Sequence, residues 1–211
     1  MTQNDALTLL KEGDPAQRRE ATMVLAAIGD DRAVPALVTT LADDDPALVH
    51  LVERALWEIW CRSGDPETDR LLQEGIDALG RQALDRAVEL FSQVIARAPS
   101  FPEAYNKRAT ALYLQGKYER AIADCEATLE MNPHHFACLC GQGLCHLALR
   151  QFRQAEACFR KTLDLYPGLE AARHNLSLAV QARIAAGNGG PRGNGGPPHP
   201  PLLPSGEKDS P

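Results

Sequence analysis

The chain has 211 residues, of which 44% are apolar and 5% aromatic, and its formal net charge at pH 7 is −6. This length and apolar fraction suffice for one or two compact domains with a buried core. Aromatic residues are scarce whereas Ala, Leu, Arg and Glu are frequent, which predicts an all-α fold. The acidic excess lies entirely before residue 67 and no basic cluster occurs, which argues against nucleic acid as a partner.

The chain shows no signal for export or for membrane insertion. Its first residues lack the basic and apolar stretches of a signal peptide, and no run of 18 apolar residues occurs. The six cysteines lie inside helical patterns, where reduced thiols are expected in a chain that is not exported. The sequence therefore predicts a cytoplasmic protein, or an organellar one if a presequence has been removed.

Two Asp-Pro pairs mark helix starts in the N-terminal third, at Asp14-Pro15 and again at Asp45-Pro46. Each pair precedes an amphipathic run, and aspartate at the N-cap followed by proline at the first helical position favours helix initiation. The pattern resembles the HEAT repeat family over roughly residues 5–64, which implies a pair of helical repeats in a domain of residues 1–66. The short stretch 6–11 is expected to form a capping helix.

The linker after this region, residues 63–67, is only a few residues long. A connection this short favours continuous stacking of the N-terminal helices on the helices that follow. Trp57 and Trp60 are expected to seal that junction. The alternative is that the two tryptophans form an exposed aromatic patch that binds a partner.

Residues 68–169 repeat every 34 positions, which is the strongest pattern in the sequence. One column holds small residues that let paired helices approach closely, and another holds prolines that end each second helix. The four repeating columns are Gly75, Ala109 and Gly143; Ala87, Ala121 and Ala155; Phe91, Cys125 and Phe159; and Pro99, Pro133 and Pro167.

This periodicity resembles the tetratricopeptide repeat family, most closely over residues 104–133. The resemblance implies three helix–turn–helix units in a right-handed α-solenoid, in which the first helices line a concave peptide-binding groove. Gly116 supplies the turn of the middle unit, whereas Gln82 and Arg150 occupy positions where the family commonly has glycine.

The region after the third unit divides into a helix and a tail. Residues 170–186 have helical apolar spacing and are expected to cap the solenoid, completing a second domain of residues 67–186. Residues 187–211 are rich in glycine and proline, which predicts a disordered tail. The tail could alternatively be a ligand for a proline-recognition domain.

The richest group of potential metal ligands comprises His134, His135, Cys138, Cys140, Cys145 and His146. On one helix Cys140 points about 200° away from Cys138, which is unfavourable for tetrahedral zinc coordination. Packing of small apolar thiols between close helices is the better interpretation, with a metal or redox role as the alternative. No nucleophile with a recognisable base, no phosphate loop and no cofactor motif is evident, so we predict no enzymatic activity and no cofactor.

The resemblance assigns the predicted peptide groove to inward positions of the three first helices. These are Leu72, Ile76, Leu79, Asn106, Thr110, Tyr113, Leu114, Cys140, Leu144 and Leu147. This surface is largely apolar and suits an amphipathic helix or an apolar peptide of a protein partner. Occupation by the capping helix or by a second copy of the chain, as in a self-associating module, is the alternative.

Some members of the family grip the C-terminal carboxylate of heat-shock chaperones with Lys, Asn and Arg side chains. The matching positions here are Leu72, Ile76, Lys107, Ala137 and Gly141, so four of the five lack the required donors. The sequence therefore disfavours this carboxylate clamp and predicts a non-catalytic scaffold or assembly factor.

Overall fold

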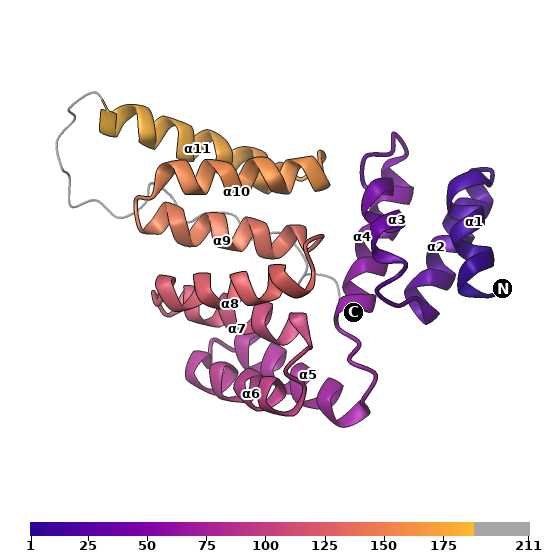
Figure 1. Ribbon diagram of the computed structural model, residues 1–211, viewed down its shortest axis with the longest axis horizontal. Helices are drawn as coiled ribbons and strands as arrows, with labels where there is room; N and C mark the ends of the chain where they lie inside the picture. The colour runs from indigo at the N-terminus through magenta and orange to yellow at the C-terminus, as the bar shows by residue number, and fades with distance from the viewer. Residues whose placement is uncertain (188–211) are drawn as a thin grey trace.

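The computed structural model describes residues 1–187, and within that range the regular elements are all α-helices (Figure 1). The all-α prediction is confirmed, and the predicted disordered tail lies outside the described residues apart from Gly187. The helices are α1 (Gln3–Glu12), α2 (Pro15–Ile28), α3 (Val34–Thr40), α4 (Pro46–Trp60), α5 (Pro66–Gly80), α6 (Leu84–Arg97), α7 (Pro102–Leu114), α8 (Tyr118–Met131), α9 (Phe136–Ala148), α10 (Phe152–Leu165) and α11 (Glu170–Gly187).

Two helices, α2 and α4, begin at the Asp-Pro pairs that the sequence indicates, and each has an aspartate as its N-cap. The Asp14 carboxylate accepts hydrogen bonds from the backbone N–H groups of Ala16 and Gln17, both at 2.9 Å, and Asp45 caps α4 from Ala47 N at 3.0 Å. These contacts satisfy N–H groups that have no partner inside the helix. The short helix α3 has no side-chain cap, and the sequence accordingly gives little sign of it.

The 34-residue period appears in the backbone at both ends of each hairpin. The residues before the three prolines, Ala98, Asn132 and Tyr166, share φ between −132° and −135° and thereby leave the helix. The turns between paired helices place Gln82, Gly116 and Arg150 at φ of 60°, 74° and 59°. Two residues with side chains thus adopt the left-handed conformation that glycine provides in the middle unit.

Paired helices approach closely because a small residue on one faces a large residue on the other. An added Cβ at Gly75 would lie 2.4 Å from Phe91 Cε1, and one at Gly143 would lie 2.6 Å from Phe159 Cε1. Both phenylalanines are fully buried. The middle unit solves the same problem with Ala109 and the smaller Cys125. The two columns of the sequence are therefore the two sides of one contact.

The hairpins α5–α10 and the capping helix α11 form one stack, and the N-terminal helices α1–α4 stand beside it (Figure 1). The expectation of continuous stacking across the linker is therefore wrong. The connection after α4 contains Gly64 at φ 85°, and the last turn of α4 contacts residues near the starts of α7 and α9. The HEAT-like helices thus meet the middle of the stack instead of extending its end.

We expect Gly143→Ala to lower the free energy of unfolding by about 2 kcal/mol, because the new methyl group must displace the Phe159 ring. Gly141→Ala, on the same helix, is the matched control. Beyond the neighbouring residues and the backbone of α9 itself, no atom lies within 4 Å of a Cβ at that position, so alanine should stabilise α9 by up to about 1 kcal/mol. Urea unfolding of both variants measures the difference, and equal shifts would contradict the close-packing account.

Candidate functional site

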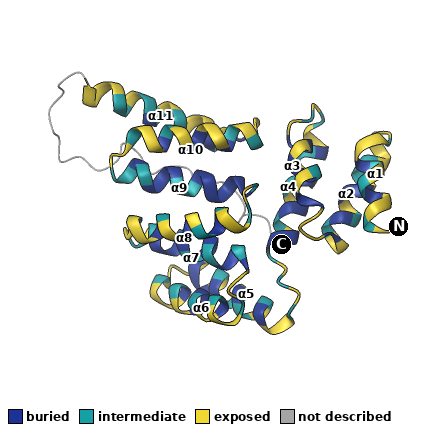
Figure 2. Ribbon diagram, in the orientation of Figure 1, coloured by how far each residue is buried: buried dark blue, intermediate teal, exposed yellow. Residues whose placement is uncertain are grey.

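The predicted groove residues lie on the first helices of the hairpins, α5, α7 and α9, and we call their shared surface the inner-helix face. Much of this face is buried, and Figure 2 shows α9 buried along most of its length. Six of the ten predicted residues are buried within the packing: Leu72, Leu79, Asn106, Cys140, Leu144 and Leu147. These six support the core in this conformation rather than offering a surface to a ligand.

Four of the predicted residues remain accessible on the inner-helix face. Leu114 is 38% exposed, and Ile76, Thr110 and Tyr113 are partly exposed. The Tyr113 ring packs against Tyr118 with 5.6 Å between ring centroids, and burial raises the pKa of Tyr113 to about 12. Tyr113 is therefore an uncharged phenol at neutral pH. This part of the face, on α5 and α7, presents apolar surface with two hydroxyl groups.

The edge of the inner-helix face, where α7 and α9 begin, is covered by the last turn of α4. The Trp60 ring stacks on the His135 imidazole with centroids 4.1 Å apart, and Trp57 meets the same imidazole edge-on at 6.0 Å. The Lys107 Nζ atom lies 4.9 Å from the centroid of the Trp57 ring. We call Trp57, Trp60, Glu103, Lys107 and His135 the junction cluster. The two tryptophans thus lie at the contact between the N-terminal unit and the stack, as expected. They pack against residues near the starts of α7 and α9 rather than against the helix that follows the linker.

A buried carboxylate organises the charged part of the junction cluster. The side chain of Glu103 is 1% exposed, and its carboxylate accepts from Asn106 Nδ2 at 3.2 Å and lies 3.6 Å from Lys107 Nζ. His135 Nε2 lies 2.8 Å from Glu103 Oε2. A buried charge needs such partners, because removing it from water is otherwise strongly unfavourable.

The hydrogen bonds of His135 define the tautomer of its imidazole ring. Its Nδ1 atom accepts from the backbone N–H of Cys138 at 3.2 Å, which caps α9. A nitrogen that accepts carries no proton, so the neutral ring holds its proton on Nε2 and donates it to Glu103. Burial by itself raises the pKa of Glu103, but the bond from His135, the charge of Lys107 and the bond from Asn106 together hold that pKa below its ordinary value.

The contact between α4 and the stack leaves some buried polar atoms without hydrogen-bond partners within residues 1–187. Trp57 Nε1 and Trp60 Nε1 are buried, and neither has a hydrogen-bond partner among the described residues. A polar pocket of about 270 Å³, which reaches Trp60 and Glu103, lies on one side of the contact. A second pocket of about 490 Å³ lies between α4 and the α10–α11 connection, where Tyr166 donates to Glu53 at 3.2 Å. The contact is therefore local and flanked by open space.

The cysteines of α8–α10 are packing residues in this structure. Cys138 and Cys145 belong to one apolar cluster with Cys125, whereas Cys140 belongs to another, as the helical geometry predicts. Burial raises the pKa of Cys140 to about 12 and that of Cys158 to about 11. Buried thiols that resist ionisation are poor nucleophiles and poor metal ligands. In residues 1–187 no three His, Cys, Asp or Glu side chains converge to hold a metal ion.

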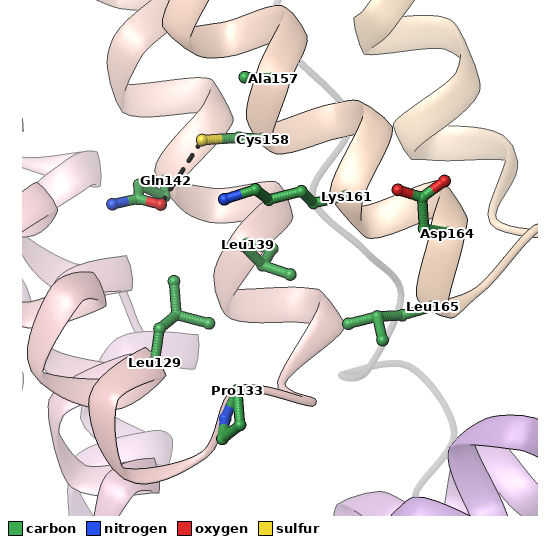
Figure 3. A pocket seen from close by; sticks show the side chains of 9 residues that line it. All are labelled: Leu129, Pro133, Leu139, Gln142, Ala157, Cys158, Lys161, Asp164 and Leu165. Carbon is green, nitrogen blue, oxygen red and sulfur yellow. Dashed lines mark hydrogen bonds between the residues drawn. The ribbon is translucent and has the colours of Figure 1, made fainter.

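A separate apolar pocket of about 440 Å³ lies between α8, α9 and α10 (Figure 3). Leu129, Leu139 and Leu165 line it, and the Lys161 side chain extends across it while Asp164 points away. The Cys158 thiol donates to Gln142 Oε1 at 3.5 Å at its rim. None of the ten predicted groove residues contributes to this pocket, so it is distinct from the inner-helix face.

The sequence singled out most members of the junction cluster for other reasons. Lys107 stood at a clamp position, His135 among the potential zinc ligands, and the tryptophans at a linker. Only the spacing of Glu103 and Lys107, four residues apart on one helix, signalled an interaction in advance. The remaining contacts join residues far apart in the sequence, for which no local signal exists.

We expect Glu103→Gln to lower the free energy of unfolding at neutral pH by about 3 kcal/mol, because Lys107 then loses its buried counter-charge. The pKa of Glu103 is depressed in the folded chain. Its stabilisation is therefore complete above the unfolded pKa near 4.5 and is lost as pH falls through the folded value.

Urea unfolding of wild type and Glu103→Gln at successively lower pH should consequently show the two stabilities converging. Glu126→Gln, at an exposed position on α8, is the control and should change little at any pH. A Glu103→Gln effect that stayed constant down to strongly acidic pH would contradict the assignment of a charged Glu103.

Comparison with protein families identifies the repeats. Tetratricopeptide repeat models match residues 72–136 and 138–168. A HEAT repeats model matches residues 4–88 and so overlaps the first tetratricopeptide match across most of α5. No helix in residues 1–187 is long and apolar enough to span a membrane.

Among similar proteins, a TPR repeat-containing protein of Rhizobium etli is 26% identical over 122 residues, which are 58% of this chain and 60% of that protein. The heat-shock protein cognate co-chaperone sgt12 of Aspergillus fumigatus is 25% identical over 148 residues, covering 63% of this chain and 43% of that protein. The chain thus spans about half the length of these two relatives.

Solved structures share the fold of the stack. The Sgt2 TPR domain from Aspergillus fumigatus is 24% identical and superimposes with a TM-score of 0.58, covering 62% of this chain and 89% of that domain. The first TPR of Spaghetti (RPAP3), solved with the HSP90 peptide SRMEEVD, is 21% identical with a TM-score of 0.55, covering 56% and 93%. The chain therefore contains tetratricopeptide repeats within residues 72–168 and HEAT repeats at its N-terminal end.

Proposed function

We propose that this protein is a non-catalytic interaction scaffold that holds a segment of a protein partner on its inner-helix face. The observation that carries the proposal is the accessible patch of Ile76, Thr110, Tyr113 and Leu114 on a face that is otherwise buried. The similar TPR domains of RPAP3 and Sti1 were solved with HSP90 and Hsp70 ligands, which supports peptide binding as the common activity of this fold. The six cysteines, which all lie in residues 1–187, form no disulfide bond and are mostly buried, which supports action in the cytoplasm.

The chemistry of the accessible patch favours an apolar or amphipathic segment over a C-terminal carboxylate. Leu72, at the first clamp position, is 2% exposed and belongs to the core. Lys107, the one cation at a clamp position, is engaged with Glu103 and lies against the Trp57 ring. A carboxylate placed there would meet apolar neighbours and a cation that is already neutralised, so its lost hydration would be poorly replaced. An apolar segment gains from burial on the same patch.

We expect Tyr113→Glu and Leu114→Glu to reduce capture of the physiological partner by about tenfold or more, because each buries a carboxylate under the bound segment. The measurement is affinity capture from a native extract with quantitative mass spectrometry. Ile184→Glu, at a position 51% exposed near the end of α11, is the matched control and should leave capture unchanged. Equal capture by all three folded variants would show that partners bind elsewhere.

We also expect the peptide SRMEEVD, named in the RPAP3 structure, to show no saturable binding to this chain in a fluorescence anisotropy titration. The physical reason is the absence of free donors at the clamp positions. Repeating the titration with Gly141→Arg, at a clamp position with open space around the side chain, tests whether one restored cation creates affinity. Saturable binding to the wild type would contradict the apolar-segment assignment.

A further inference from the structure

The last turn of α4 lies on the surface of the stack in the way that a bound helical peptide would. Trp57 and Trp60, three residues apart, project from one side of the helix, so both rings reach the same surface. That surface consists of Lys107 on α7, with His135 and Phe136 at the start of α9, and the Trp60 and Phe136 ring centroids are 5.3 Å apart. One turn earlier, Glu53 accepts from the Tyr166 hydroxyl at 3.2 Å. A small set of side chains therefore carries the attachment of the α1–α4 unit.

The surface beneath the tryptophans selects for aromatic rings. The neutral His135 imidazole offers a flat face for stacking, and the Lys107 ammonium lies over a ring, an arrangement that favours π-systems. Hydrogen bonding does not explain the choice of tryptophan, because both indole N–H groups are buried without a partner. A phenylalanine would keep an aromatic ring in the contact without a buried N–H group, although it would bury less apolar surface than an indole. The contact therefore requires aromatic rings at the two positions rather than tryptophan in particular.

We propose that Lys107, His135 and Phe136 form a helix-docking surface whose resident ligand is α4, and whose partner is an amphipathic helix with two aromatic side chains three residues apart. A carboxylate four residues before the first aromatic completes the motif, as Glu53 precedes Trp57. The partner helix displaces α4 and takes its place. This surface differs from the accessible patch of α5 and α7, so the inference goes beyond the proposed function and does not rest on it.

Two features make exchange of the resident helix feasible. The linker is short, so α4 competes at high local concentration, but the hydrogen bond and ring contacts of α4 with the stack come from Glu53, Trp57 and Trp60 and have a pocket on either side. The Glu103 carboxylate keeps its bonds from Asn106 and His135 and its pairing with Lys107, all within the stack, when α4 leaves. The buried carboxylate of this surface therefore keeps its hydrogen-bond partners without α4, and the surface can accept a second helix.

The test uses the full chain with the resident aromatics removed, Trp57→Ala/Trp60→Ala, and a fluorescein-labelled peptide of residues 45–62 as the probe. We expect the peptide to bind the variant at least about tenfold more tightly than the wild type, whose surface is occupied. The same peptide with alanine at both tryptophan positions is the control and should not bind. A peptide with phenylalanine at both should still bind the variant, because it keeps an aromatic ring at each position.

Equal binding to wild type and variant, or no binding to a variant with wild-type circular dichroism and melting temperature, would overturn the proposal. If the double variant does not fold, Trp57→Ala replaces it. Trp60 is then the only tryptophan, and displacement must shift its emission to longer wavelength; no shift at saturating phenylalanine peptide overturns the proposal equally. Because Tyr113-dependent capture is measured separately, failure here leaves the proposed function standing, and failure of that capture leaves the docking surface standing.

Discussion

The stack depends on how closely the two helices of each hairpin approach. Gly75 against Phe91 and Gly143 against Phe159 are contacts in which a hydrogen atom is the largest substituent that fits. This closeness places each first helix beside the next, so that α5, α7 and α9 share one face. The same constraint explains why α9 can carry several cysteines: small side chains are required between helices packed this tightly.

The inner-helix face of this chain is divided into parts with different properties. Along α9 the face is buried and structural, with Cys140, Leu144 and Leu147 in the core. On α5 and α7 it stays accessible and apolar, which is the basis for the scaffold proposal. At the starts of α7 and α9 the face presents the polar side chains of Lys107 and His135, and the tryptophan rings of α4 cover them. A partner therefore meets a surface already shaped by the chain's own N-terminal unit.

Glu103 connects these parts of the molecule. A carboxylate this deeply buried is compatible with folding only because Asn106 and Lys107 from its own helix, and His135 from the next unit, surround it. His135 in turn caps α9 and stacks under Trp60. One side chain thus performs three tasks: it bonds the carboxylate, starts a helix and receives the N-terminal unit. A substitution at His135 should therefore be harder to accommodate than one at any residue of the accessible patch.

The sequence by itself determined the hairpins. Three local signals define them: Asp-Pro pairs at helix starts, prolines two residues beyond α6, α8 and α10, and small residues that repeat every 34 positions. Each signal acts between residues close together in the sequence, so it predicts the same local structure whatever the rest of the chain does. Even the left-handed turns at Gln82 and Arg150 could be placed by their register with Gly116.

Only the tertiary structure decided where the N-terminal unit lies and which groove residues are accessible. The contact of Trp60 with His135 joins residues 75 positions apart in the sequence, across a linker that lies outside the 34-residue period. Burial of Leu72 or Leu144 likewise depends on neighbouring helices rather than on the position within a repeat. Periodicity reports the face on which a side chain lies, whereas exposure depends on what packs against that face.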